Sequence, residues 1–84
     1  MSITIRIIGA DWCPDCRRIK DLLNEKKISF VYEDQGDVKE KAKDISGNPK
    51  IPCCVFPGPT FLNEPSNEDM MKKLMEIGLV DSST

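Results

Sequence analysis

The hydrophobic pattern near the N-terminus changes its period, and this change constrains the fold more than any other feature. Ile3, Ile5 and Ile7 alternate with polar residues, which is typical of a strand. From Pro14, which suits the first turn of a helix, apolar residues recur on one helix face: Cys16, Ile19, Leu22 and Leu23. A strand followed directly by an amphipathic helix predicts a parallel second strand, reached by a right-handed crossover.

The rest of the chain continues this alternation of strands and helices. The expected elements are a strand at 29–33, a helix from its cap Asp37 to about Ile45, a strand at 51–56, a turn at 57–59, a strand at 60–62, and a helix that Ser66 opens and Gly78 ends. Consecutive strands joined by a tight turn form an antiparallel hairpin. The predicted order is therefore β-α-β-α-β-β-α, an α/β fold with a mixed four-stranded sheet flanked by three helices.

The size and charge of the chain limit its partners. Eighty-four residues leave room for one domain, residues 1–84, in which we expect 81–84 to be a frayed tail. The net charge of −2 argues against a nucleic-acid partner, because such partners require a basic surface. No apolar run is long enough to span a membrane, and no basic region of a signal peptide precedes the first strand. We expect a cytoplasmic monomer without a membrane partner.

The chain contains no histidine, which excludes imidazole bases and imidazole metal ligands. Its chemistry must come from thiols, carboxylates or amines. In a cytosolic chain, four cysteines favour catalysis or metal binding over a structural disulfide framework. Cys13 and Cys16 are the most informative, because they form a Cys-x-x-Cys motif directly after the first strand and at the start of the first helix.

This position predicts different roles for the two thiols. A helix N-terminus favours a thiolate, so Cys13 is the predicted nucleophile. Cys16 lies one turn later on the apolar stripe, so we expect it to be buried, within disulfide reach of Cys13, and the resolving thiol. Cys53 and Cys54 are adjacent in a predicted central strand, so they point to opposite faces and are expected in the core.

A metal-binding module is the alternative function for the same cysteines. A zinc site would pair Cys13 and Cys16 with Cys53 and Cys54, although zinc sites usually combine two spaced cysteine pairs. An iron-sulfur cluster shared by two chains through Cys13 is the second form of this alternative. The preferred interpretation includes no metal ligand.

The element order, the Cys-Pro-x-Cys motif and Ile51-Pro52 before the third strand resemble the glutaredoxin-like branch of the thioredoxin superfamily. The similarity covers about residues 3–77. It implies an oxidoreductase that reduces disulfides of proteins or small molecules through Cys13 and Cys16. It also implies that Pro52 is cis and lies beside these cysteines, where backbone groups pair with the substrate.

Residues around the motif are the predicted binding residues. Trp12 is expected to be an exposed platform for a partner, with core packing as the alternative. Lys50 would offset the negative charge of Asp15, which stands where glutaredoxins usually have an aromatic residue. The complete predicted substrate-binding set is Trp12, Pro14, Lys50, Ile51, Pro52, Glu68 and Asp69.

The resemblance leaves the electron donor open. Residues 12–16 match a thioredoxin-related family reduced by thioredoxin reductase, whereas 62–69 are more similar to mycoredoxins. Pro65-Ser66 stands where glutathione-dependent members carry Gly-Gly. No cofactor is expected, and the reductant would be glutathione, another low-molecular-weight thiol or a flavin-dependent reductase. The predicted helix N-terminus at Ser66 would hold a carboxylate of a thiol tripeptide.

Overall fold

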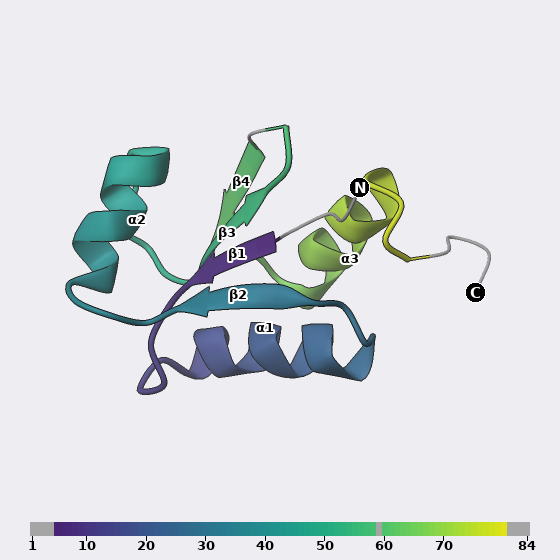
Figure 1. Cartoon of the computed structure of the whole chain (residues 1–84), viewed down its shortest axis with the longest axis horizontal. Coiled ribbons are helices and arrows are strands. Elements are labelled where there is room, and N and C mark those ends of the chain that lie inside the picture. The colour runs from purple at the N-terminus through teal and green to yellow at the C-terminus, as the bar shows by residue number, and fades with distance from the viewer. Residues whose placement is uncertain (1–4, 59, 81–84) are drawn as a thin grey trace.

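The computed structural model describes residues 5–58 and 60–80 and has the predicted order of elements (Figure 1). The elements are β1 (Ile5–Ile8), α1 (Pro14–Glu25), β2 (Phe30–Glu33), α2 (Val38–Ser46), β3 (Cys53–Phe56), β4 (Thr60–Asn63) and α3 (Asn67–Glu76). The predicted α/β fold, with its three helices and four strands, is confirmed.

The four strands form one mixed sheet in the order β2-β1-β3-β4. The pair β1-β2 is parallel, whereas β1-β3 and β3-β4 are antiparallel. The parallel pair follows from the α1 crossover, and the last pair is the predicted hairpin. Since β1 and β3 are the central strands and run antiparallel, the loop that follows β1 and the segment that precedes β3 lie side by side at one edge of the sheet.

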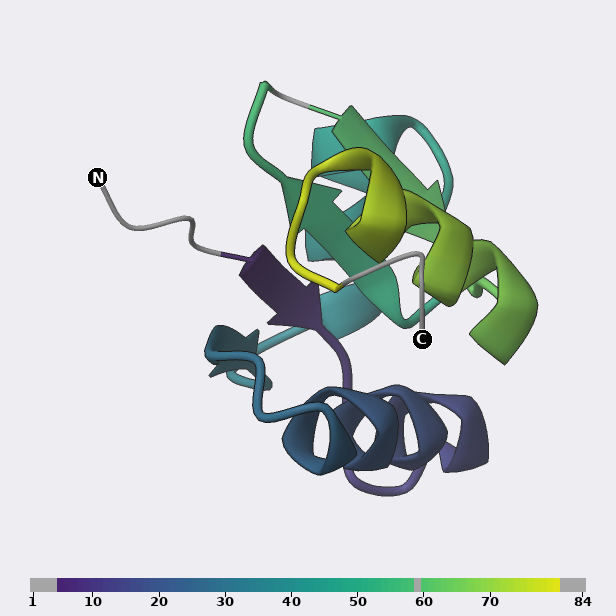
Figure 2. The same cartoon turned by 90° about the vertical axis from the view of Figure 1, so that its right-hand side faces the viewer.

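Helices cover both faces of the sheet, and α2 lies apart from α1 and α3 (Figures 1 and 2). One core cluster joins β1 and β3 to α1 and α3, with Ile7, Leu23 and Leu74 among its fully buried members. The other joins the sheet to α2 through Val38 and Ala42. This second cluster also contains Cys13 and Cys16, so the start of α1 is part of the core beneath α2.

Local side-chain chemistry sets the helix ends. The side chain of Asp37 accepts a hydrogen bond from the Glu40 N–H at 3.1 Å, and Ser66 accepts one from the Asp69 N–H at 3.0 Å, as predicted. Gly47 ends α2 with a left-handed φ of 78°, which a residue without Cβ adopts at little cost.

Several predicted boundaries were wrong. The third strand begins at Cys53 rather than Ile51, because Pro52 has no N–H to donate to a neighbouring strand. Ile3, Pro59 and the predicted tail at 81–84 lie outside the described residues. Within the described ranges, no helix is long and apolar enough to cross a membrane.

Candidate active site

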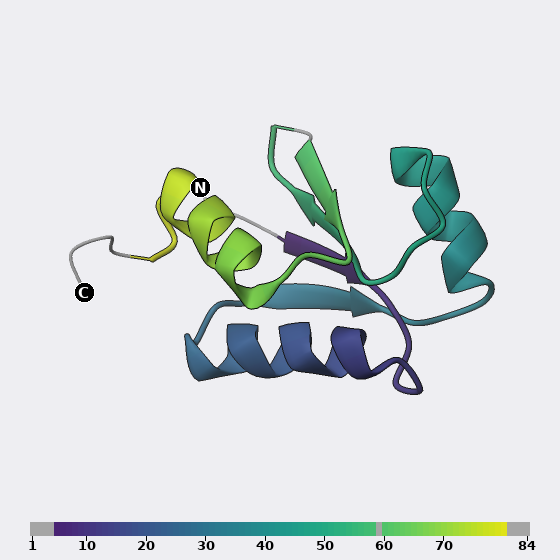
Figure 3. The same cartoon turned by 180° about the vertical axis from the view of Figure 1, so that it is seen from behind.

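The loop after β1 brings Cys13 to the start of α1, at the end of the molecule where α2 also begins (Figure 3). Cys13 is the N-cap of α1, and its Sγ accepts a hydrogen bond from the backbone N–H of Cys16 at 3.3 Å. The thiol of Cys13 is 3.9 Å from the carbonyl oxygen of Ile51, to which it donates. A thiolate at this position would meet the free N–H groups and the positive dipole end of α1.

Cys16 lies behind Cys13 and is fully buried, as the apolar pattern of α1 predicted. Burial, reinforced by the hydrogen bond with Cys13, raises the pKa of Cys16 to about 12. A Cβ on Gly9 would stand 2.7 Å from Cys16 Sγ, closer than such atoms approach, so the sulfur occupies space that only glycine leaves free. The structure therefore pairs a capping thiol with a buried, protonated one.

The Ile51-Pro52 peptide bond is cis, as the resemblance implied. The segment around it is held by the end of the hairpin, at Asn63 and Glu64. The Glu64 N–H donates to the Pro52 carbonyl at 2.8 Å, and the Asn63 side chain donates to the Lys50 carbonyl at 3.0 Å. This places the backbone of Ile51 directly beside the Cys13 thiol.

A groove of about 330 Å³ opens over Cys13. Its lining residues come from the Cys13 loop, α2 and the segments flanking β3 and β4: Trp12, Cys13, Lys39, Pro49, Lys50, Ile51 and Glu64. Trp12 is 67% exposed, so its alternative placement in the core was wrong. Lys39 Nζ lies 5.6 Å from the centre of the Trp12 ring, a cation–π geometry. The groove thus combines an aromatic wall with two lysines, Lys39 and Lys50.

The sequence comparison agrees with this geometry. Residues 3–59 match the Glutaredoxin family, which is more than half of the chain. The chain belongs to the glutaredoxin family. The match includes all four cysteines and Pro52 but ends before β4 and α3. No curated protein was found to match this glutaredoxin.

Three groove residues of this glutaredoxin were not predicted from the sequence: Lys39, Pro49 and Glu64. Lys39 is in the first turn of α2 and Glu64 follows β4, so both are distant from the motif along the chain. Glu64 has a left-handed φ of 51°, which a sequence pattern does not reveal for a glutamate. The place of Lys39 in the groove can be inferred only once the structure shows that α2 starts near the Cys13 loop.

Four predicted binding residues are not among those that line the groove: Pro14, Pro52, Glu68 and Asp69. Pro14 is the first residue of α1 and lines a separate hollow of about 430 Å³ between α1 and the start of α3. Glu68 and Asp69 are exposed in the first turn of α3. The structure therefore brings together Trp12, Cys13, Lys50 and Ile51 from the predicted set, with Pro52 next to them.

Arg18 connects α1 to the start of α3. Its guanidinium donates to Asn67 Oδ1 at 2.6 Å and to the Pro65 carbonyl at 2.9 Å, and lies 3.4 Å from the Asp15 carboxylate. Asp15, expected to act on Cys13, therefore has a positive partner within its own helix.

Cys53 and Cys54 are fully buried, one in each core cluster, which confirms that they point to opposite faces. Burial raises the pKa of both thiols. Among residues 5–58 and 60–80, no three His, Cys, Asp or Glu side chains form a cluster able to hold a metal. Nothing in this part of the chain favours the metal-binding alternative.

Proposed function

We propose that this glutaredoxin reduces disulfides of proteins or small molecules through Cys13 and Cys16. Membership of the family implies thiol-disulfide oxidoreductase activity. The observation that carries the assignment to these residues is the hydrogen bond from the Cys16 N–H to Cys13 Sγ, with Cys13 at the groove and Cys16 behind it. This arrangement provides one accessible nucleophile and one enclosed resolving thiol.

The reaction proceeds through a mixed disulfide. The Cys13 thiolate attacks one sulfur of the substrate disulfide, and the other substrate sulfur leaves as a thiolate that takes a proton from water. Cys16 then loses its proton and attacks Cys13 Sγ. The second substrate sulfur leaves with its electron pair, and the enzyme retains a Cys13-Cys16 disulfide. Two electrons have passed from the dithiol to the substrate.

The groove favours substrates that carry a carboxylate near the disulfide. Lys39 and Lys50 line it against the single carboxylate of Glu64, so the local charge is positive although the whole chain is negative. Trp12 offers an exposed apolar surface beside Cys13. The backbone of Ile51 lies where an extended substrate segment would pair, as in related folds. Lys39→Glu with Lys50→Glu should therefore raise KM for an acidic disulfide peptide more than for a neutral one.

We propose that a low-molecular-weight thiol such as glutathione, or a flavin-dependent reductase, restores the dithiol, and that no bound cofactor takes part. The cytosol is the proposed compartment, because it keeps such thiols reduced. Disulfide-containing proteins are the proposed partners of a monomeric enzyme.

The decisive experiment follows reduction of a model disulfide with two electron donors side by side. One reaction contains glutathione with glutathione reductase, and the other contains thioredoxin reductase, each with NADPH. We expect turnover with one donor and none in Cys13→Ser. Absence of turnover with both donors, together with a coloured or zinc-containing purified protein, would favour the metal-binding module instead.

A further inference from the structure

Tyr32 in β2 has a buried hydroxyl that makes no hydrogen bond with any of the described residues. A buried hydroxyl usually has a partner, because leaving water without one costs free energy. The function described above does not use this group. The exception therefore calls for a state of the protein in which the hydroxyl does find a partner.

The sulfur of Cys16 and this hydroxyl both border the space beside Gly9. The point where a Gly9 Cβ would stand is 2.7 Å from Cys16 Sγ and 3.4 Å from Tyr32 Oη, so both atoms converge above the bare backbone of Gly9. No hydrogen bond joins them in the thiol form that the structure describes. A thiolate is a much stronger acceptor than a thiol, whereas a phenol is a good donor.

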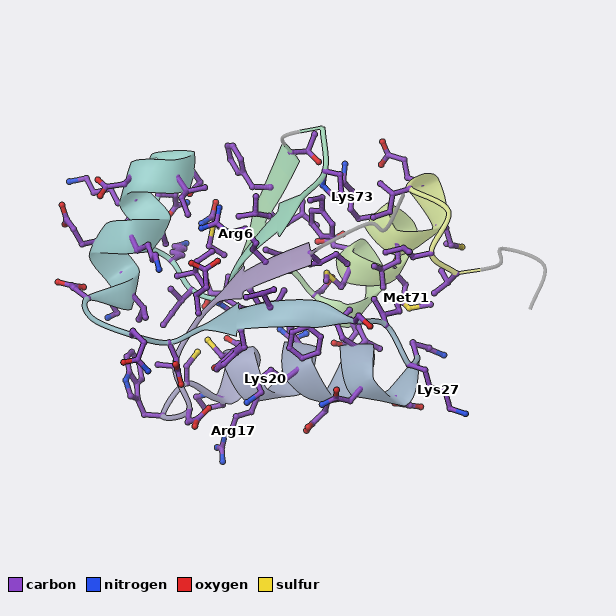
Figure 4. All side chains as sticks on the ribbon, viewed as in Figure 1. Arg6, Arg17, Lys20, Lys27, Met71 and Lys73 are labelled. Atoms are coloured by element: carbon purple, nitrogen blue, oxygen red, sulfur yellow. The ribbon has the colours of Figure 1, made fainter. Side chains whose placement is uncertain are left out.

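The surroundings keep the phenol protonated and shielded. Lys20 extends from α1 toward β2 (Figure 4), and its Nζ lies 4.0 Å from the centre of the Tyr32 ring and 3.5 Å from an Asp11 carboxylate oxygen. Burial is the main cause that raises the pKa of Tyr32, followed by the charges of Cys16, Asp11, Asp34 and Cys13. The hydroxyl therefore acts as a donor and not as a base.

We propose that the Tyr32 hydroxyl donates a hydrogen bond to Cys16 Sγ whenever that sulfur carries negative charge. This inference rests on the proposed function. It makes Tyr32 a catalytic residue for the two steps in which Cys16 reacts.

Negative charge reaches Cys16 in both halves of the cycle. In resolution, the Cys16 thiol gives its proton to water, and its thiolate attacks Cys13 Sγ while the substrate sulfur leaves. In regeneration, the thiolate of the electron donor attacks Cys13 Sγ, the Cys13-Cys16 bond breaks, and Cys16 leaves as a thiolate that then takes a proton from water. Both steps place an anion on a fully buried sulfur, where the low local dielectric makes a nearby donor most effective.

The expected gain is moderate, because a stabilised thiolate is also a weaker nucleophile. With a Brønsted coefficient of about 0.4–0.5, a tenfold larger thiolate population lowers the intrinsic nucleophilicity by roughly threefold. The net gain is then about threefold for each tenfold increase in thiolate. Since a hydrogen bond to a charged group is among the stronger ones, we expect loss of the hydroxyl to slow resolution by about threefold to tenfold.

The test uses dithiobis(nitrobenzoate), a disulfide whose thiolate product is coloured. Attack by Cys13 releases one thionitrobenzoate, and attack by Cys16 on the mixed disulfide releases a second. Cys16→Ser identifies the second phase, because it must remove that phase. In Tyr32→Phe we expect an unchanged first phase and a second phase that is about threefold to tenfold slower.

A stability measurement separates this role from simple packing. Tyr32→Phe keeps the ring and removes a hydroxyl that is unpaired in the thiol form, so its thermal unfolding should occur at the same or a higher temperature. Tyr32 is the only tyrosine in the chain, so growth with difluorotyrosine changes this hydroxyl alone. That more acidic phenol should give a second phase at least as fast as the native one.

Three results have distinct meanings. A wild-type protein without a second phase would overturn the proposed function itself. A normal wild-type second phase that Tyr32→Phe leaves within twofold would overturn the inference alone. Lower thermal stability with equal slowing of both phases would also overturn it, because the ring would then act only through packing.

Discussion

The backbone N–H of Cys16 donates a hydrogen bond to Cys13 Sγ at 3.3 Å, so the two cysteines are already in contact in the reduced protein. This contact holds the sulfur of Cys13 over the first turn of α1, on the path by which Cys16 must attack it. It is also an N-cap interaction, of a kind that stabilises helices by about 1 kcal/mol. A single contact thus serves both the fold and the arrangement of the two thiols.

Alkylation rates should differ sharply between the two cysteines. Cys13 lines the groove and keeps 7% of its surface exposed, whereas Cys16 is fully buried and has its pKa raised to about 12. We expect brief iodoacetamide treatment near neutral pH to label Cys13 alone, as read by mass spectrometry of peptides. Labelling of Cys16 should become faster as pH rises toward its pKa, because only the thiolate reacts. Faster labelling of Cys16 than of Cys13 in the folded protein would reverse the two roles.

Gly9→Ala should destabilise the fold through Cys16. The new Cβ would stand 2.7 Å from Cys16 Sγ, and we expect the free energy of unfolding to fall by about 1–3 kcal/mol, as in other overpacked cores. Urea unfolding measures this change. In a Cys16→Ala background the sulfur is absent, so the same substitution should cost less. Equal costs in the two backgrounds would show that another contact is responsible.

Glu33 should make the stability depend on pH in the acidic range. Hydrogen bonds from Arg6 and then Lys41, whose Nζ is 2.8 Å from Glu33 Oε1, hold the pKa of Glu33 at about 2. An unfolded glutamate has a pKa of about 4.3, so the ionised form stabilises the fold above that pH, and the contribution is lost as pH falls toward 2. Glu33→Gln should therefore cost about 1 kcal/mol at pH 7 and nothing near pH 2.

Asp21→Asn is the matched control for Glu33. Asp21 is an exposed carboxylate in α1 with no ion pair among the described residues. Urea unfolding of the two variants at both pH values should show a pH-dependent loss in Glu33→Gln only. A loss at pH 7 that persists unchanged near pH 2 would contradict the ionic origin.

Arg18 should contribute to stability through its two contacts with the start of α3. Arg18→Ala removes the bonds to Asn67 and the Pro65 carbonyl, and we expect a loss of about 1–2 kcal/mol in urea unfolding. Arg17 is the neighbouring control, since it is exposed and makes no side-chain hydrogen bond within the described ranges. Equal effects of Arg17→Ala and Arg18→Ala would mean that helix propensity, and not the contact with α3, explains the loss.

The sequence predicted the fold and the two thiols because both depend on local patterns. Periodicity places Cys16 on the buried stripe of α1, and the position of Cys13 after a strand makes it the cap. The groove depends on contacts between distant segments. Lys39 lines the groove only because α2 begins near the Cys13 loop, and the Tyr32 hydroxyl lies near Gly9 only because β2 pairs with β1. Strand pairing and register of this kind cannot be predicted from the sequence of any single segment.

The roles of Glu68 and Asp69 as substrate-binding residues stay predictions. The two residues were chosen by their place in the last helix, but the structure holds them exposed in α3 and outside the groove lining. The family match itself ends before that helix. The sequence did not predict the ion pair between Asp15 and Arg18. Asn67 and the Pro65 carbonyl, which are distant from Arg18 along the chain, hold its guanidinium near Asp15.

Mass mapping of the air-oxidised protein tests the central claim most directly. The protein is oxidised, alkylated, unfolded, alkylated again with a second reagent, and digested. The account predicts one disulfide, Cys13 to Cys16, with Cys53 and Cys54 carrying only the second label, because both are fully buried. A disulfide that joins Cys13 to Cys53, or a zinc ion that is lost only when Cys53 or Cys54 is replaced, would contradict it.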